Sequence, residues 1–156
     1  MLTTQDVIDN FELLDDWEAR YAYLVELGEA LPPLDERLRA DANQVKGCIS
    51  KVWVCPVARP GSDPRVDFVG DCDTAIIKGV LALLIELMSG HTPGEIEDLD
   101  IDGLFDELQL AEHLSPNRHF GIYAIVELMK SQARSQSADH AESESERAAT
   151  GKGLAG

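Results

Sequence analysis

Two N-terminal segments carry apolar residues at the three-to-four-residue spacing of amphipathic helices. In the first segment these positions are Val7, Ile8, Phe11 and Leu14, and in the second they are Trp17, Tyr21, Leu24 and Leu27. Thr3 or Thr4 precedes the first predicted helix, and Asp16 is a suitable N-cap for the second. The pair Pro32-Pro33 ends this region, because consecutive prolines cannot continue a helix.

A polar stretch over residues 35–46 separates these helices from a segment with the composition of a β-strand. β-branched and aromatic residues from Ile49 onward predict the strand. The turn residues of 60–64 (PGSDP) follow, and alternation over 65–69 predicts a return strand. The pattern therefore predicts an antiparallel β-hairpin.

The longest apolar segment, residues 75–88, predicts a helix inside the core. Asp73 is placed to cap its N-terminus, and Gly90 has the position of a C′ glycine. Thr92 and Glu95 form the pattern of a capping box before a short helix. Another short helix is predicted around 103–108.

Ser115 and Pro116 precede a last predicted helix. Its apolar positions are Phe120, Ile122, Ile125, Val126 and Met129. Together the elements predict an α+β fold, with a small antiparallel sheet packed against several helices. We expect one domain over residues 1–134. Residues 135–156 lack aromatic side chains and any apolar period, so we expect a disordered C-terminal tail.

The charge of the chain restricts the classes of partner. A net charge of -16 repels nucleic acid and anionic membranes, and favours a protein partner. No apolar run reaches the roughly 20 residues that span a bilayer. The acidic N-terminus lacks the basic and apolar regions of a signal peptide. We therefore expect a cytoplasmic location.

Three cysteines, Cys48, Cys55 and Cys72, are an odd number and lack C-x-x-C spacing. This argues against a disulfide framework, and at least one free thiol is expected. Cys48 stands out because it lies where a loop meets a strand, beside Gly47, with Lys46 and Lys51 nearby. Cations favour the nucleophilic thiolate. The alternative is that Cys48 is a small buried apolar residue.

The other two cysteines have different surroundings. Cys55 lies within the predicted strand and is interpreted as structural. Cys72 lies between Asp71 and Asp73, whose charges disfavour a thiolate, although the same grouping would suit a metal ion.

The segment 43–54, NQVKGCISKVWV, resembles the sulfur-acceptor motif of the SufE/CsdE family. Three further blocks resemble the same family in the same order. They are WEARYAYLVELGEALPPL at 17–34, GDCDTAIIKG at 70–79 and HLSPNRHFGI at 113–122. The resemblance covers about residues 5–134. Cys72 departs from the pattern, because a small residue such as serine is expected there, and it raises the possibility of a second participating thiol.

The resemblance implies that Cys48 accepts a persulfide sulfur from a pyridoxal-phosphate cysteine desulfurase of the SufS/CsdA type. The chain would stimulate that enzyme and pass sulfur to an iron–sulfur scaffold complex of the SufBCD type. The supporting residues are Gly47, Lys51, Asp73 and Arg118. The chain would be a sulfur-transfer accessory protein with no cofactor or metal of its own, as a monomer or weak homodimer.

Two alternatives remain open at this point. One is a U-type iron–sulfur scaffold, which shares the fold and would use Cys48 and Cys72. The other is an acidic interaction module with inert cysteines. A hydrolase is disfavoured because the sequence has no nucleophile elbow and no phosphate-binding loop.

Overall fold

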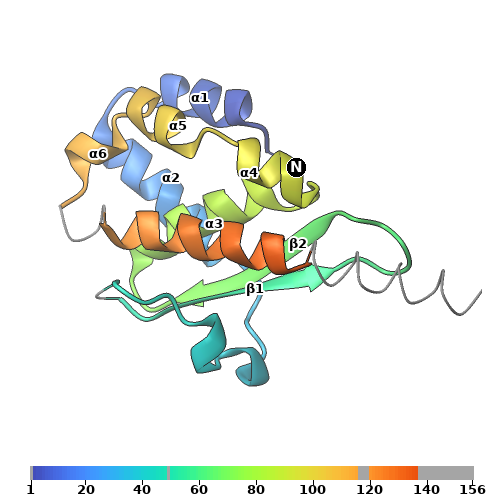
Figure 1. Cartoon of the computed structure of the whole chain (residues 1–156). Helices are drawn as coiled ribbons and strands as arrows, with labels where there is room; N and C mark the ends of the chain where they lie inside the picture. Colours follow the sequence, from blue (N-terminus) through green and yellow to red (C-terminus); the bar gives the residue numbers. More distant parts are fainter. Residues whose placement is uncertain (1, 49, 116–119, 137–156) are drawn as a thin grey trace, which may run out of the picture.

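The computed structural model describes residues 2–48, 50–115 and 120–136, and it confirms the predicted α+β architecture (Figure 1). A two-stranded antiparallel hairpin lies along one side of a group of helices. The helices are α1 (Thr4–Leu13), α2 (Trp17–Glu29), α3 (Ala75–Met88), α4 (Pro93–Asp98), α5 (Ile101–Glu107), α6 (Leu110–His113) and a last helical segment over 120–136. The remaining elements are the 3-10 turns η1 (Glu36–Leu38) and η2 (Asp41–Asn43) and the strands β1 (Val52–Ala58) and β2 (Val66–Cys72).

Most of the predicted helix boundaries are confirmed by their caps. Thr3 and Asp6 form a capping box at α1, and Thr92 and Glu95 form another at α4. The Asp16 carboxylate accepts a hydrogen bond from the third residue of α2. Short polar side chains thus satisfy the amide groups that a helix N-terminus leaves unpaired.

The second strand is longer than the alternation over 65–69 predicts. It continues through residues 70–72, which the sequence pattern assigned to the loop before the core helix. Cys72 pairs with Val52 at one end of the hairpin, and Ala58 pairs with Val66 at the other. The side chains that point from the hairpin into the core are Val52, Val54, Val66, Phe68 and Cys72.

The prediction that Asp73 caps the core helix is wrong. Thr74 is the N-cap of α3, and its side chain makes no capping hydrogen bond. The Asp73 carboxylate instead accepts a hydrogen bond from the Lys51 backbone N–H at 3.0 Å. The Asp73 N–H donates to the Lys51 carbonyl at 3.1 Å, so Asp73 continues the hairpin rather than starting the helix.

Helix α3 is the centre of the core and packs against α2 and β2. Its crossing with α2 depends on two glycines. A Cβ on Gly79 would overlap the Leu24 carbonyl, and one on Gly28 would lie 2.9 Å from the Gly79 nitrogen. Only glycine at these positions allows the two backbones to approach this closely.

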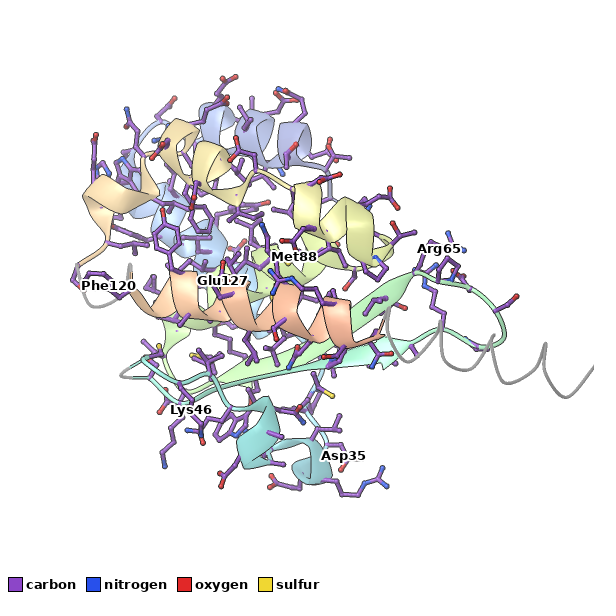
Figure 2. The ribbon with its side chains drawn as sticks, viewed as in Figure 1. Asp35, Lys46, Arg65, Met88, Phe120 and Glu127 are labelled. Atoms are coloured by element: carbon purple, nitrogen blue, oxygen red, sulfur yellow. The ribbon has the colours of Figure 1, made fainter. Side chains whose placement is uncertain are left out.

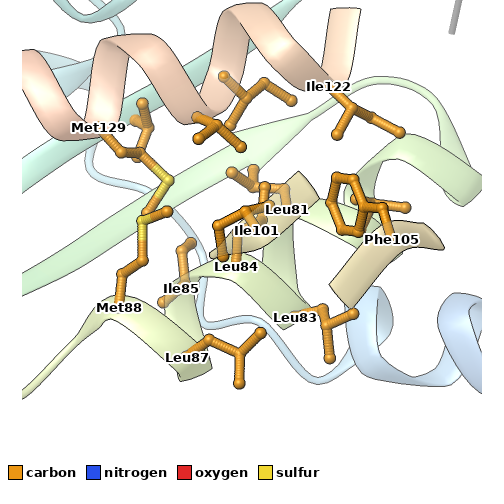
Figure 3. Close-up of a cluster of buried hydrophobic side chains, with 14 of the residues drawn as sticks. Leu81, Leu83, Leu84, Ile85, Leu87, Met88, Ile101, Phe105, Ile122 and Met129 are labelled. Atoms are coloured by element: carbon orange, nitrogen blue, oxygen red, sulfur yellow. The ribbon is translucent and has the colours of Figure 1, made fainter. Parts of the chain in front are cut away.

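The last helix runs alongside the hairpin and lies in front of α3 in the view of Figure 1. Ile122 and Met129 project from it into the buried cluster, with Ile122 on the side of Phe105 and Met129 on the side of Met88 (Figure 3). Near its C-terminal end, the Gln132 side chain donates a hydrogen bond to the Val54 carbonyl at 2.8 Å. This bond joins the helix to the middle of β1.

Three elements were absent from the sequence predictions, namely η1, η2 and α6. Each spans only three or four residues, which is too short to show a period of apolar positions. Helix α6 follows Gln109, whose left-handed backbone (φ 58°) separates it from α5. Within the part of the chain that the structure describes, no helix is both long and apolar enough to span a bilayer.

Candidate functional site

Cys48 lies in the loop before β1, and its half-buried side chain is turned toward the last helix. Its sulfur lies over Gly121, where an added Cβ would be only 2.6 Å from Sγ. Real Cβ atoms do not come this close to another heavy atom. Gly121 has no Cβ, and this leaves the space that the Cys48 thiol occupies. The thiol is therefore turned inward, as expected if a reactive sulfur is kept from the solvent.

Gly47 holds the backbone beside this thiol in a conformation that other residues adopt with strain. Its φ is 86°, in the left-handed region, and no atom lies within 4 Å of an added Cβ. The requirement for glycine at this position is conformational and not steric.

On its strand side, the loop that carries Cys48 is fixed to the turn between β2 and α3. Besides the paired hydrogen bonds of Lys51 with Asp73, the hydroxyl groups of Ser50 and Thr74 lie 2.6 Å apart. The loop is thus anchored on the strand side of Cys48 and has its left-handed glycine on the other. The side chains of Lys46 and Lys51 are exposed.

Cys72 is buried at the end of β2, and its Sγ accepts a hydrogen bond from the Thr74 N–H at 3.4 Å. Burial raises the pKa of the Cys72 thiol to about 11, and the nearby charges of Asp73, Cys48 and Asp71 act in the same direction. The flanking aspartates were expected to have this effect, but burial is the larger cause.

Cys55 is half-buried on β1, where its thiol contacts the Pro56 carbonyl at 3.5 Å. Burial raises the pKa of this thiol also. Desolvation therefore disfavours the thiolate at Cys55, in agreement with its interpretation as a structural residue.

A cluster of charged side chains lies beside the hairpin, and the sequence patterns predicted only part of it. The Asp71 carboxylate pairs with Arg39 and, at 3.1 Å, with Lys78. Burial raises the pKa of Asp71, but the hydrogen bonds from Arg39, the Cys72 N–H and Lys78 outweigh it and lower the pKa overall. The Arg39 guanidinium also lies 5.0 Å from the centre of the Trp53 ring. These contacts hold the segment of η1 and η2 against the hairpin.

Of this cluster, Asp71 and Lys78 belong to the 70–79 block, whereas Arg39 was missed. Arg39 lies in a polar stretch without periodicity, 32 positions before its partner, so no local signal could have identified it. Lys78 is the ion-pair partner of Asp71.

The block 113–122 is described only in part. Arg118, the supporting residue expected there, and Ile49 beside Cys48 lie outside the described residues. His113 stacks on Trp17 with the ring centres 3.7 Å apart, and its carbonyl accepts a hydrogen bond from the Tyr21 hydroxyl at 2.5 Å. Phe120, at the other end of the block, is 68% exposed (Figure 2).

Across the described ranges, no group of three or more His, Cys, Asp or Glu side chains is arranged to hold a metal ion. Cys72 with its flanking Asp71 and Asp73, a grouping that would suit a metal ion, does not form such a cluster in those ranges. Asp71 is engaged by Arg39 and Lys78, and Asp73 by the Lys51 amide.

Comparison with known proteins places this arrangement in a family. The sequence model of the SufE Fe-S metabolism associated domain matches residues 5–133. The chain belongs to the SufE family. It therefore takes part in iron–sulfur metabolism, in the sulfur-transfer role of that family.

Two curated relatives have the same designation. An uncharacterized SufE-like protein of Rhizobium meliloti is 37% identical over 134 residues, covering 85% of this chain and 96% of the relative. A SufE-like protein of Rhizobium etli is 38% identical over 141 residues, covering 88% and 94%. The similarity thus extends over nearly the whole length of both relatives.

The fold also has a solved counterpart. The solution structure of a hypothetical protein from Thermus thermophilus superposes with a TM-score of 0.71, covering 86% of this chain and 96% of that one. At 20% identity this similarity supports the fold alone.

Proposed function

We propose that Cys48 accepts a persulfide sulfur from a cysteine desulfurase and passes it to an iron–sulfur cluster scaffold complex. The single observation that supports this proposal best is the position of Cys48. Its sulfur is half-buried against Gly121, beside a left-handed glycine, in the segment that resembles the family's acceptor motif. The other two thiols are disfavoured as nucleophiles by burial, which raises the pKa of each.

The proposed reaction is a thiol exchange. The Cys48 thiolate attacks the outer sulfur of the desulfurase persulfide and forms a new S–S bond. The S–S bond of the enzyme persulfide breaks, and the enzyme cysteine leaves as a thiolate. The transferred sulfur keeps its hydrogen, so Cys48 becomes a persulfide and no electrons are gained or lost overall. The step needs no metal and no cofactor on this chain.

The residues around Cys48 have supporting roles in this proposal. Gly47 provides the backbone freedom to turn the thiol outward when the desulfurase docks. Asp73 holds the Lys51 backbone, so the strand side of the loop stays in place during this motion. Lys51 and Lys46 add positive charge near a thiolate that must form before attack. Arg118 is proposed to stabilise the thiolate or the persulfide.

The direct test is mass spectrometry of the chain after incubation with a SufS/CsdA-type desulfurase and cysteine, without reductant. The proposal expects one added sulfur, about 32 Da, on the peptide that contains Cys48. Desulfurase turnover should rise when the chain is added. Cys48→Ser should abolish both results, because an alcohol cannot carry a persulfide and is far less acidic than a thiol.

Cys72→Ser is the matched control. The proposal expects this variant to retain most of the stimulation and the added mass on Cys48. Equal loss in both variants would favour a relay between two thiols or a U-type scaffold. In the scaffold alternative, protein purified without oxygen would contain iron that is lost in Cys48→Ser.

A further inference from the structure

Phe120 is a large apolar side chain on the surface of this acidic molecule. It is 68% exposed at the start of the described part of the last helix. Among the large apolar side chains that the structure describes, Leu13 at 80% is also strongly exposed, and Val57 at 42% is exposed to a lesser degree. Single exposed apolar residues are common, so exposure alone assigns Phe120 no role.

The distance of Phe120 from the acceptor thiol is the informative observation. Gly121 directly follows Phe120, and its missing Cβ would lie 2.6 Å from the Cys48 sulfur. Given standard backbone dimensions, the Phe120 Cα lies within about 8 Å of that sulfur. Figure 2 shows Phe120 at the end of the last helix, at the same end of the molecule as Lys46.

We propose that Phe120 is the apolar anchor by which a cysteine desulfurase docks over Cys48. This inference rests on the function proposed above. Sulfur transfer requires the two sulfur atoms to reach bonding distance, about 2 Å. The partner must then cover the surface around Cys48, and a side chain this close becomes buried under it. The partner surface that fits is an apolar slot at the rim of the desulfurase active site.

The chemistry of the surrounding surface agrees with this role. Aromatic residues bury a large area at little conformational cost and dominate the energy of many interfaces. Lys46 and Lys51 are exposed within three positions of Cys48 and provide charged groups for a polar rim. A rim of this kind mainly affects the rate and specificity of association. Phe120 is therefore expected to provide affinity, and the lysines orientation.

The experiment compares Phe120→Ala with Leu13→Ala, which removes the other strongly exposed large side chain, on α1. For each variant, calorimetry gives the dissociation constant for the desulfurase, and a titration gives the concentration for half-maximal stimulation. Loss of an interface anchor should raise both values at least about tenfold in Phe120→Ala. Leu13→Ala should change them less than about twofold, and saturating Phe120→Ala should still reach the wild-type maximum.

Two further measurements make the result decisive. Phe120→Leu should restore most of the affinity, and the melting temperature of Phe120→Ala should equal that of the wild type because the side chain is exposed. Unchanged affinity in Phe120→Ala overturns the inference. So does an effect confined to self-association, measured by sedimentation, because a second copy would then be the occupant. Failure of wild-type Cys48 to gain sulfur would overturn the proposed function together with this inference.

Discussion

The sulfur of Cys48 occupies the space that a side chain on Gly121 would fill. The two residues are 73 positions apart, so no local sequence pattern could have predicted their contact. The contact makes the last helix one wall of the proposed acceptor site. It also suggests a way to expose the thiol without altering Cys48 itself, namely a substitution at Gly121.

Gly121→Ala should push the Cys48 thiol outward. The added methyl group would lie 2.6 Å from Sγ, and the sulfur can move more easily than the helix backbone. We expect several-fold faster alkylation of Cys48 by iodoacetamide in the free protein, with the fold retained because alanine favours a helix. Peptide mapping of the alkylated protein measures this rate. An unchanged rate would show that the thiol is already accessible in the wild type.

Gly47→Val should slow sulfur transfer more than it weakens docking. Valine at a φ of 86° is strained, whereas no neighbouring atom obstructs its side chain. The matched control is Gly47→Asn, because asparagine tolerates the left-handed region better. Single-turnover transfer rates and dissociation constants for the desulfurase separate the two effects. Equal rates in the two variants would contradict a conformational role for Gly47.

The stability of the protein should decrease in alkaline solution because of Cys72. Its pKa is about 11 in the folded protein, above the ordinary 9.0 of an exposed thiol. Between these two values the unfolded chain loses the proton while the folded chain keeps it, so the free energy of unfolding falls as the pH rises. Urea denaturation at pH 8 and pH 10.5 tests this, with Cys72→Ala as the comparison. The fall should be smaller in the variant, and equal falls would assign it to other groups.

Gly79→Ala should destabilise the fold through the contact between α2 and α3. The new Cβ would overlap the Leu24 carbonyl, so the two helices must separate. Overpacking of this kind costs about 1–3 kcal/mol or more of unfolding free energy. Gly94→Ala is the control, because nothing lies within 4 Å of its added Cβ. Chemical denaturation should show a loss only for Gly79→Ala.

Local patterns were sufficient for the elements whose signals lie within a few residues. The N-cap at Asp16 and the capping box at Thr92 were predictable because a cap satisfies amide groups three positions away. The core helix was predictable because its apolar run is too long for a strand. The β-hairpin was recognised, but β2 proved longer, because pairing with β1 extends a strand beyond its local pattern.

The role of Asp73 shows where local reasoning failed. An aspartate two positions before an apolar helix looks like a cap, but its carboxylate binds the Lys51 backbone across the hairpin. The ion pair between Arg39 and Asp71 could not be predicted either, because its two residues are distant in the sequence and meet only in the folded chain. Contacts across the fold depend on which segments meet, and sequence spacing does not encode that.

For the proposed acceptor site, the position of Cys48, the adjacent glycine and the resemblance to the SufE family could all be recognised in the sequence. These features are contiguous in the chain, and the match over residues 5–133 confirms the family. Only the folded structure shows that Gly121 leaves room for the sulfur and that Phe120 is exposed nearby. It also shows that burial, more than the flanking aspartates, disfavours the Cys72 thiolate. Packing and desolvation depend on atoms that are distant in the sequence and meet only when the chain folds.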